Sequence, residues 1–260
     1  MKTPKLTLLG AGPGDPELIS IKGAKALATA NVVLYDALVH PDLLKHAPTS
    51  AEFVYVGKRA GKCAYGQEDI NKLIIEYALH FGHVVRLKGG DPFIFGRGHE
   101  ELVAAKEAGI TTEIIPGISS SISVPEMQEI PLTRRHINES FWVITGTTKS
   151  GEFSKDIELA AQSSATVVVL MGMNNLERIS NIFKNFGKSN LPVAIIQNGT
   201  RENERIGLGT IATINEVVAR KQLGSPAIIV IGEVVKLHPS YVAELVKHES
   251  NSDTSNITNQ

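Results

Sequence analysis

Cysteine, long hydrophobic runs and net charge are all scarce in this sequence of 260 residues, and each scarcity excludes a class of protein. Cys63 is the only cysteine, so an internal disulfide and a cysteine-rich zinc site are both excluded, and a reducing compartment is expected. The apolar runs Val167–Met171 and Ala227–Ile231 are far shorter than the roughly 20 residues that cross a bilayer. The N-terminus also lacks the layout of a signal peptide. We therefore expect a cytoplasmic protein that has no membrane partner.

The charges of the two signs almost cancel. Lysine and arginine together number 26 and aspartate and glutamate 27, which leaves a formal net charge of −1. Such a balance creates no general field that would hold the chain on nucleic acid or on an anionic membrane. An anionic small molecule would need a local pocket of basic side chains. We predict a small-molecule substrate and no nucleic-acid partner.

Short strand-like runs alternate with segments of helical period along nearly the whole chain. This alternation is typical of α/β folds with parallel sheets, and 42% apolar residues suffice for a sizeable core. The clearest helix is expected at 68–81, where apolar residues recur at i, i+3 and i+4 and Gly82 follows. The expected strands are 6–10, 32–35, 53–56, 84–87, 112–115, 141–145, 166–171, 193–197 and 227–232.

A break in the alternation between Pro116 and Asn138 predicts two domains. Glycine, a run of serines and two prolines interrupt the pattern there. Residues 248–260 contain one large apolar residue, Ile257, so we expect a disordered tail. The predicted organisation is an N-terminal α/β domain at 1–120, a connecting segment at 121–139, a C-terminal α/β domain at 140–247 and the tail at 248–260.

Two glycine-rich turns follow expected strands and are candidate ligand-binding loops. The turn at 10–16 resembles a dinucleotide fingerprint but has Asp15 where glycine or alanine is required, and Pro13 lacks an amide that a phosphate could use. Taken alone, it is equally well a tight structural connection. The turn at 89–98 combines four glycines with Asp91 and apolar side chains, a composition that suits a flat heteroaromatic ligand. Both turns follow parallel strands, so we expect them to meet at one crevice.

Charged residues follow two further strands and are expected at the same edge of the sheet. Asp36 follows one strand, and Lys58 and Arg59 follow another. A carboxylate beside cations suits an acidic substrate and a proton transfer. The alternative is a solvated basic turn near a surface carboxylate. The segment His99–Val103 begins like the zinc motif H-E-x-x-H but has valine at the second ligand position, so we expect a helix start there and no metal site.

These loops carry a family resemblance. The sequence resembles the uroporphyrinogen-III C-methyltransferases, a branch of the tetrapyrrole methylase family, from residue 5 to about residue 237. GAGPGD from Gly10 marks the wider family, whereas GKRAG from Gly57 together with GGDPFIFGRG from Gly89 is specific to the branch. Further matching segments are YDALV from Tyr35, EIIPGISS from Glu113, IPLTRR from Ile130, NGT from Asn198 and SPAIIVIGEVV from Ser225.

The resemblance implies a two-domain tetrapyrrole methylase fold with mostly parallel sheets, an active site in the cleft between the domains, and usually a homodimer. It implies S-adenosyl-L-methionine as the cofactor, with S-adenosyl-L-homocysteine as its product. Asp36 and Lys58 match the family's proposed proton acceptor and donor. Basic residues expected to bind substrate are Arg59, Arg97 and Arg135. The cofactor-binding residues that the resemblance implies are Pro13, Gly89, Gly90, Asp91, Ile94, Ser119, Ser120, Met171, Gly199, Pro226 and Ala227.

The activity that the resemblance implies is methylation of uroporphyrinogen III at C2 and then C7. The product is precorrin-2, formed by way of precorrin-1, in sirohaem or cobalamin biosynthesis. Two alternatives stay open: a methylase of a later corrin precursor, and a tetrapyrrole-binding module without turnover. The sequence departs from the family at Ala37, where arginine is common, and at Arg134, where histidine is usual. Both departures concern contacts to the substrate rather than to the cofactor.

Overall fold

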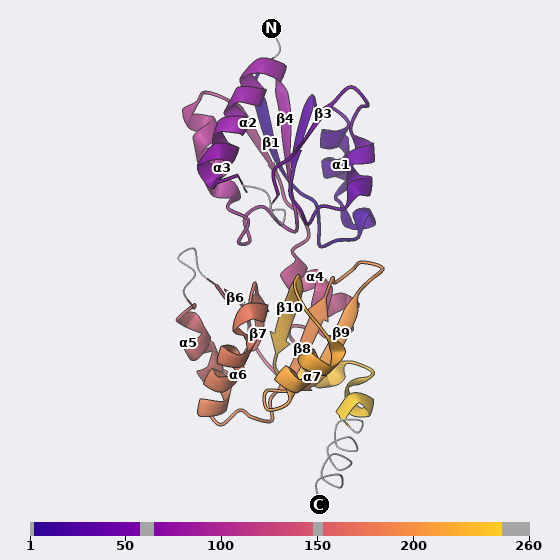
Figure 1. Ribbon diagram of the computed structural model, residues 1–260, viewed down its shortest axis with the longest axis vertical. Helices are drawn as coiled ribbons and strands as arrows, with labels where there is room; N and C mark the ends of the chain where they lie inside the picture. The colour runs from indigo at the N-terminus through magenta and orange to yellow at the C-terminus, as the bar shows by residue number, and fades with distance from the viewer. Residues whose placement is uncertain (1–2, 58–64, 148–152, 246–260) are drawn as a thin grey trace, which may run out of the picture. The chain divides into compact units, whose positions relative to one another are not determined.

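The computed structural model describes residues 3–57, 65–147 and 153–245 and falls into two compact units, Met1–Ser120 and Ser121–Gln260. Each unit contains a five-stranded sheet and several helices (Figure 1), which confirms the predicted α/β class. Lys58, Arg59 and the expected tail lie outside the described residues. Within the described residues, no helix is long and apolar enough to cross a membrane.

The sheet of the first unit is entirely parallel, with strand order β3-β2-β4-β1-β5. Gly10 pairs with Lys88, and Tyr35 with Leu87, so β1, β2 and β4 end at the same edge. A parallel sheet is stable when both of its faces are covered, and the strand side chains of β1 and β4 are buried accordingly. The strands are β1 (Lys5–Gly10), β2 (Val32–Tyr35), β3 (Glu52–Tyr55), β4 (His83–Lys88) and β5 (Thr111–Ile115).

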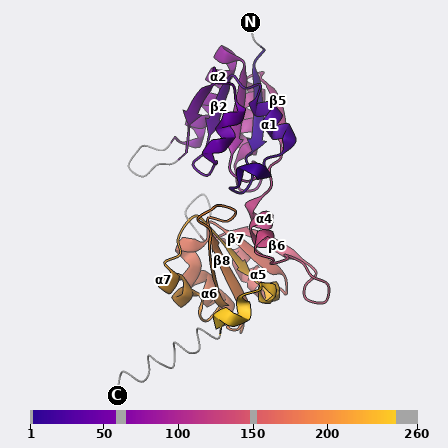
Figure 2. The ribbon, with the colours of Figure 1, turned by 90° about the vertical axis from the view of Figure 1, so that its right-hand side faces the viewer.

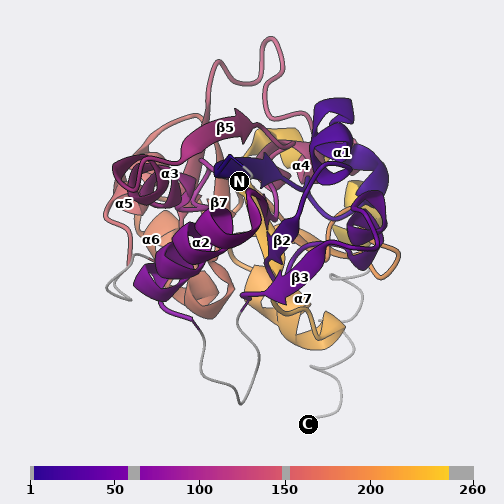
Figure 3. The ribbon, with the colours of Figure 1, turned by 90° about the horizontal axis from the view of Figure 1, so that it is seen from above.

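Helices cover both faces of this sheet. α2 and α3 pack against one face, around Leu6, Leu34 and Val84, whereas α1 and η2 pack against the other (Figure 1 and Figure 3). α2 confirms the helix expected at 68–81, with Ile70 and Ile74 buried on the sheet. The helical elements are η1 (Pro16–Leu18), α1 (Ile21–Leu27), η2 (Pro41–His46), α2 (Gln67–Phe81) and α3 (Gly98–Glu107).

The sheet of the second unit is mixed, with strand order β6-β7-β10-β8-β9. β6 and β7 are parallel, whereas β10 runs opposite to both β7 and β8, and β9 runs opposite to β8. The short segment 198–204 joins β8 to β9, and a connection of this length requires antiparallel neighbours. The expectation of parallel strands therefore describes the first sheet better than the second. The strands are β6 (Phe141–Thr145), β7 (Thr166–Leu170), β8 (Pro192–Gln197), β9 (Arg205–Thr210) and β10 (Ala227–Ile231).

Strand β9 was not expected from the sequence. Its central residues include Gly207 and Gly209, and glycine is depleted in strands because it offers no side chain to pack. The structure explains the composition: a Cβ atom added to Gly207 would lie 2.7 Å from Leu223 Cδ1 and 3.0 Å from Val217 Cγ1. Close packing of a helix on this strand therefore overrides the local preference.

Helices also cover both faces of the second sheet. α5, α6 and α7 pack on one face, and α4 and η4 pack on the other (Figure 1 and Figure 2). The segment 121–139, expected to be a connection, contributes Val124 and Ile130 to this second core. The helical elements are α4 (Ser120–Met127), α5 (Asp156–Gln162), η3 (Met173–Asn175), α6 (Leu176–Asn185), α7 (Ile214–Lys221) and η4 (Glu233–Leu237).

Glu113 forms a double ion pair at the edge strand β5. Its carboxylate lies 2.7 Å from Lys22 Nζ and 2.8 Å from Lys5 Nζ. Hydrogen bonds from Lys22 and then Lys5 lower the pKa of Glu113 to about 2. These contacts join α1, β1 and β5 at the surface of the first unit.

Replacing Glu113 by glutamine is expected to cost less than about 1 kcal/mol of unfolding free energy at neutral pH, because the ion pairs are partly exposed. The folded pKa is lower than the unfolded one, so this stability is present above about pH 4.5 and is lost as the pH falls towards about 2. Urea unfolding of the wild type and the Glu113→Gln variant across this range measures the difference. Glu107→Gln, at an exposed position of α3, is the control. A Glu113→Gln difference that stays constant down to pH 2 would contradict the assignment.

Candidate functional site

The loops that follow β1, β4 and β5 meet at the carboxyl edge of the first sheet. Gly12 and Gly90 exchange two main-chain hydrogen bonds, with N···O distances of 2.7 and 3.3 Å. A Cβ atom added to Gly117 would lie 2.2 Å from Gly90 O and 2.6 Å from Gly10 Cα. A side chain at Gly117 is therefore excluded by backbone atoms of the other two loops. The predicted convergence of the two glycine-rich loops is confirmed.

Asp91 fastens the loops together. Its Oδ1 accepts a hydrogen bond from the amide of Phe93 at 2.8 Å, and its Oδ2 accepts one from the amide of Gly117 at 3.1 Å. The neighbouring Gly90 has a φ of +65°, which favours glycine. A Cβ atom added to Gly90 would meet only Ser120 N, at 3.9 Å, among the described residues beyond its chain neighbours. Gly90 therefore leaves an open, backbone-lined cradle.

All cofactor-binding residues predicted in the first unit lie on these loops. Exposed apolar side chains, including Phe93, Ile94 and Phe95, share the loop after β4, and Ile118 and Leu38 are exposed on the loops after β5 and β2. Backbone polar groups beside apolar side chains suit a flat heteroaromatic ligand. The predicted residues at this edge are Pro13, Gly89, Gly90, Asp91, Ile94, Ser119 and Ser120.

Asp36 follows β2 at the same edge and is paired with a buried arginine. Arg86 Nη2 donates to Asp36 Oδ1 at 2.6 Å, and Arg86 Nε donates to Glu101 Oε1 at 3.2 Å. Lys88 Nζ lies 2.9 Å from Glu101 Oε1 and 4.0 Å from Asp36 Oδ2. Asp36 is 28% exposed at its side chain, whereas Glu101 is completely buried. We call Asp36, Arg86, Lys88 and Glu101 the charged cluster.

Burial lowers the pKa of Lys88 from its ordinary value, and the positive charge of Arg86 lowers it further. The nearby carboxylates of Glu101 and Asp36 act in the opposite direction. Sequence analysis missed Arg86, Lys88 and Glu101. A signal was present, because two cations at alternate positions near the end of a largely apolar strand point to a buried partner.

Arg97 is also at this edge, where it precedes α3 with a left-handed φ of +59°. Its Nε donates to Glu100 Oε1 at 2.8 Å and its Nη2 to Glu100 Oε2 at 2.5 Å. This pairing raises the pKa of Arg97. The guanidinium is therefore already engaged by a carboxylate that an anionic ligand would have to displace. α3 begins at Gly98, so the prediction that His99–Val103 opens a helix is confirmed.

Lys58 and Arg59 fall outside the described residues, but the preceding Gly57 is described. A Cβ atom added to Gly57 would lie 2.4 Å from the amide nitrogen of Ala37. The chain after β3 therefore leaves its strand directly against the residue that follows Asp36. No three metal-ligating side chains gather anywhere in the described part of the chain.

The predicted cofactor residues of the second unit lie at one edge of its sheet. The amide of Asn198, next to Gly199, donates to the carbonyl of Pro226 at 3.0 Å. A Cβ atom added to Gly199 would clash with Val124 Cγ1 at 2.4 Å, so α4 packs directly against this loop. Met171 follows β7, and β7 and β8 are both neighbours of β10, which begins at Ala227. The structure thus brings these residues together within the second unit.

Arg135 lies at the opposite edge of that sheet. The loop that carries it precedes β6, and the side-chain amide of Asn138 donates to Thr166 Oγ1 at the start of β7. Met171 lies beyond the end of β7, and β6 runs parallel to β7. Within the second unit, Arg135 is therefore separated from the predicted cofactor residues by the length of a strand, and its assignment stays a prediction.

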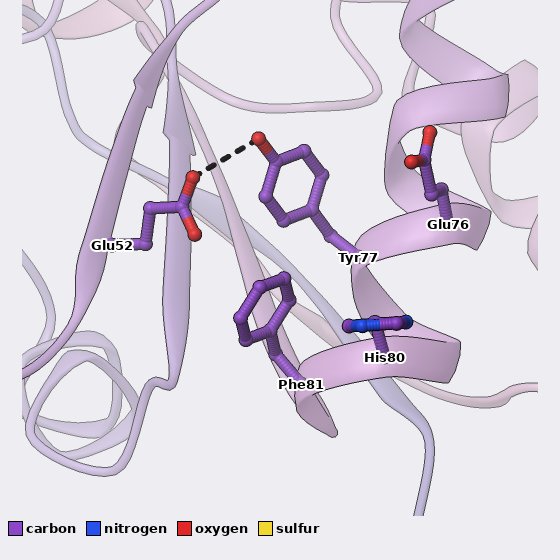
Figure 4. Close-up of a pocket in the computed structure, with 5 residues that line it drawn as sticks. All are labelled: Glu52, Glu76, Tyr77, His80 and Phe81. Atoms are coloured by element: carbon purple, nitrogen blue, oxygen red, sulfur yellow. Dashed lines mark hydrogen bonds between the residues drawn. The ribbon is translucent and has the colours of Figure 1, made fainter.

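A second hollow lies at the amino edge of the first sheet (Figure 4). Its volume is about 310 Å³, and Tyr77 OH donates across it to Glu52 Oε1 at 3.0 Å. Glu52 begins β3, and Phe81 ends α2 shortly before β4 begins. The hollow therefore lies at the amino ends of the strands, whereas the glycine-rich loops lie at their carboxyl ends. No residue predicted from the sequence as functional lines it. Its lining residues are Glu52, Glu76, Tyr77, His80 and Phe81.

Glycine-rich loops and a charged side chain at the carboxyl edge of a parallel sheet are typical of α/β proteins that bind a small ligand there. The family model described as Tetrapyrrole (Corrin/Porphyrin) Methylases matches residues 5–215. The chain belongs to this family.

Known relatives support the same placement. A uroporphyrinogen-III C-methyltransferase of Methanocaldococcus jannaschii is 47% identical over 237 residues, which cover 90% of this chain and 98% of that protein. A siroheme synthase of Actinobacillus pleuropneumoniae is 43% identical over 234 residues, 90% of this chain and 48% of its own length. The structure is similar to that of uroporphyrin-III C-methyl transferase from Thermus thermophilus complexed with S-adenyl homocysteine, with a TM-score of 0.78, 34% identity and coverage of 90% and 99%.

Alanine at position 117 is expected to destabilise the protein by about 1–3 kcal/mol, because its Cβ atom has no space between the backbones of Gly90 and Gly10. Chemical denaturation of the Gly117→Ala variant measures this loss. Gly224→Ala is the control, since no heavy atom among the described residues lies within 4 Å of its added Cβ. Equal stability of the two variants would show that the loops do not meet as described.

Proposed function

We propose that the protein is an S-adenosyl-L-methionine-dependent methyltransferase that methylates uroporphyrinogen III at C2 and C7 to give precorrin-2 by way of precorrin-1. The observation that carries the proposal is the 47% identity to a uroporphyrinogen-III C-methyltransferase along nearly the full length of that relative. The product belongs to sirohaem or cobalamin biosynthesis, and the similarity to a siroheme synthase favours the former route.

The loops at the carboxyl edge fit the proposed cofactor. S-adenosyl-L-methionine supplies an electrophilic methyl group and leaves as S-adenosyl-L-homocysteine. The open cradle at Gly90 allows a ligand to lie against the main chain, where amides and carbonyls bind its polar groups. Further residues proposed to bind the cofactor lie together within the second unit, and they are Met171, Gly199, Pro226 and Ala227.

The charged residues fit the proton transfer that must follow methylation. A pyrrole carbon that receives a methyl group leaves a cationic ring system, and this cation loses a proton. Asp36 Oδ1 is already bonded by Arg86, which leaves Oδ2 as the oxygen that accepts this proton. Lys58 is proposed as the proton donor.

Basic side chains are proposed to bind the substrate carboxylates. Arg59 is proposed on its sequence motif alone. Arg97 precedes α3 at the carboxyl edge and would exchange its bond to Glu100 for a substrate carboxylate. Arg135 completes the set that was predicted from the sequence. A homodimer and a cytoplasmic location are further parts of the proposal, which sedimentation and cell fractionation test.

The mass of the product tests the activity directly. Incubation with uroporphyrinogen III and S-adenosyl-L-methionine under reducing conditions is expected to add two methyl groups, with release of S-adenosyl-L-homocysteine. No methyl transfer to this substrate, with transfer to a later corrin precursor, would establish the alternative enzyme. Tight tetrapyrrole binding without transfer to either would indicate a binding module.

A side chain at Gly90 is expected to block the cofactor. Asparagine tolerates the left-handed backbone, so Gly90→Asn is expected to fold but to bind S-adenosyl-L-homocysteine at least about tenfold more weakly, measured by calorimetry. Gly109→Asn is the matched control, because Gly109 has a similar φ of +72° and no described atom within 4 Å of an added Cβ. Unchanged affinity of the Gly90→Asn variant would remove this loop from the cofactor site.

A further inference from the structure

The charged cluster contains three side chains to which the proposed reaction assigns no role. Arg86 and Lys88 are 1% and 4% exposed on the central strand β4, and Glu101 on α3 is completely buried. Their neighbours in the same core are leucine, isoleucine, valine and alanine. Side chains of this charge are almost never fully buried unless they are paired.

Stability alone is a weak explanation of the cluster. Removing ions from water costs several kcal/mol for each ion, and a buried ion pair is often no more stabilising than apolar residues of similar volume. Apolar side chains at these positions would continue the core that surrounds them. The charges therefore provide something that apolar packing would not.

The hydrogen bonds of Arg86 hold its guanidinium group in one orientation. Nη1 of Arg86 lies 3.4 Å from the carbonyl oxygen of Leu34 and 3.2 Å from that of Leu87, while Nε is held by Glu101. These contacts to β2, β4 and α3 fix the plane of the guanidinium from several directions. Nη2 remains, and it donates to Asp36 Oδ1 at 2.6 Å.

The geometry of Asp36 follows from this arrangement. A carboxylate with one oxygen bound to a fixed donor loses rotational freedom, so the direction of its second oxygen is set. Lys88 Nζ lies 4.0 Å from that second oxygen, which is beyond hydrogen-bonding distance. Lys88 instead bonds to Glu101 at 2.9 Å, so the Glu101 carboxylate contacts both cations beneath Asp36.

We propose that Arg86, held in place by Glu101, is a positioning residue that orients the Asp36 carboxylate to accept the proton released after methyl transfer. This inference rests on the proposed function, because it assigns to Asp36 the role of base. Arg86 is 1% exposed, so its effect on the reaction is expected to pass through the partly exposed Asp36. Lys88 balances the second negative charge of the cluster.

A double-mutant cycle on the full chain tests the inference. Asp36→Asn alone is expected to lower kcat roughly 10²- to 10⁴-fold. Arg86→Lys keeps the positive charge but loses the planar fork, and is expected to lower kcat about 10- to 100-fold with an unchanged Kd for S-adenosyl-L-homocysteine. In the double variant, Arg86→Lys is expected to cause no further fall, because its effect passes through Asp36.

A second variant covers the case in which Arg86→Lys does not fold. Glu101→Gln preserves the size of the side chain and leaves the Arg86–Asp36 contact possible, but it releases Arg86 from its charged anchor. Its kcat is expected to fall about tenfold, again only when Asp36 is present. Glu113→Gln is the matched control, since Glu113 also pairs with two cations in the same unit, and its kcat is expected to equal that of the wild type.

The outcomes separate the inference from the proposed function. If the wild type forms the dimethylated product and Asp36→Asn is slow, an Arg86→Lys or Glu101→Gln effect of equal size with and without Asp36 overturns the positioning role alone. The same holds if both variants keep the full rate. Full activity of Asp36→Asn overturns the role of Asp36 as base and the role of Arg86 with it. A wild type that transfers no methyl group overturns the proposed function itself.

Discussion

The contact between the backbones of Gly10, Gly90 and Gly117 is the constraint on which the carboxyl edge of the first unit depends. Adjacent parallel strands β1, β4 and β5 end together, so the loops that follow them compete for the same space. Only residues without a Cβ atom allow carbonyl oxygens and Cα atoms to approach as closely as they do here. Asp91 then binds the amide of Gly117 and joins the loops without adding bulk at the contact. The result is a surface built from main chain, which a ligand with many polar atoms can approach directly.

The charged cluster is the second feature of the carboxyl edge. Three of its four side chains are buried between β4 and α3 rather than exposed on the surface. Arg86 and Lys88 occupy buried positions of β4 immediately before its glycine-rich loop, and Glu101 contacts them from α3. Their placement beneath Asp36 contrasts with the Glu113 ion pairs, which lie on the exposed edge strand and contribute little. Under the proposed positioning role, the buried charges fix the geometry of one carboxylate, whereas the surface ion pairs of Glu113 have no such role.

Much of this architecture could be predicted from the sequence because the spacing of apolar residues along the chain distinguishes strands from helices. Alternating strand and helix patterns predict the α/β class and the helix α2. The rule that parallel strands end at one edge predicts that the loops at Gly12 and Gly90 meet. Strand β9 was missed because its glycines are required by the close packing of α7 over them. This packing is a tertiary contact that the local sequence does not show. Glu101 was missed for a similar reason. Its partners lie on another element, β4, 15 and 13 residues earlier, and the other acidic residues of α3 give it no distinctive local pattern. Arg135 was placed among substrate ligands from its residue type and motif alone, which carry no information about which edge of the sheet a loop occupies.

The contacts at the carboxyl edge of the first sheet are held by several elements, whereas those at the amino edge depend on single side chains. This difference favours the carboxyl edge as the place of the proposed reaction. At the amino edge, the hollow is lined by the half-buried Tyr77 and by exposed side chains that one substitution could remodel. The side-chain hydrogen bond across it joins Tyr77 on α2 to the exposed Glu52. At the carboxyl edge, the positions of the loops depend on the absence of side chains, and the orientation of Asp36 depends on a guanidinium fixed by three elements of the fold. An interaction held from several directions keeps its geometry when a ligand binds, whereas one held by a single mobile side chain adapts to it. Proton transfer requires the first kind, because its rate depends on a donor and an acceptor that are already aligned before the reaction begins.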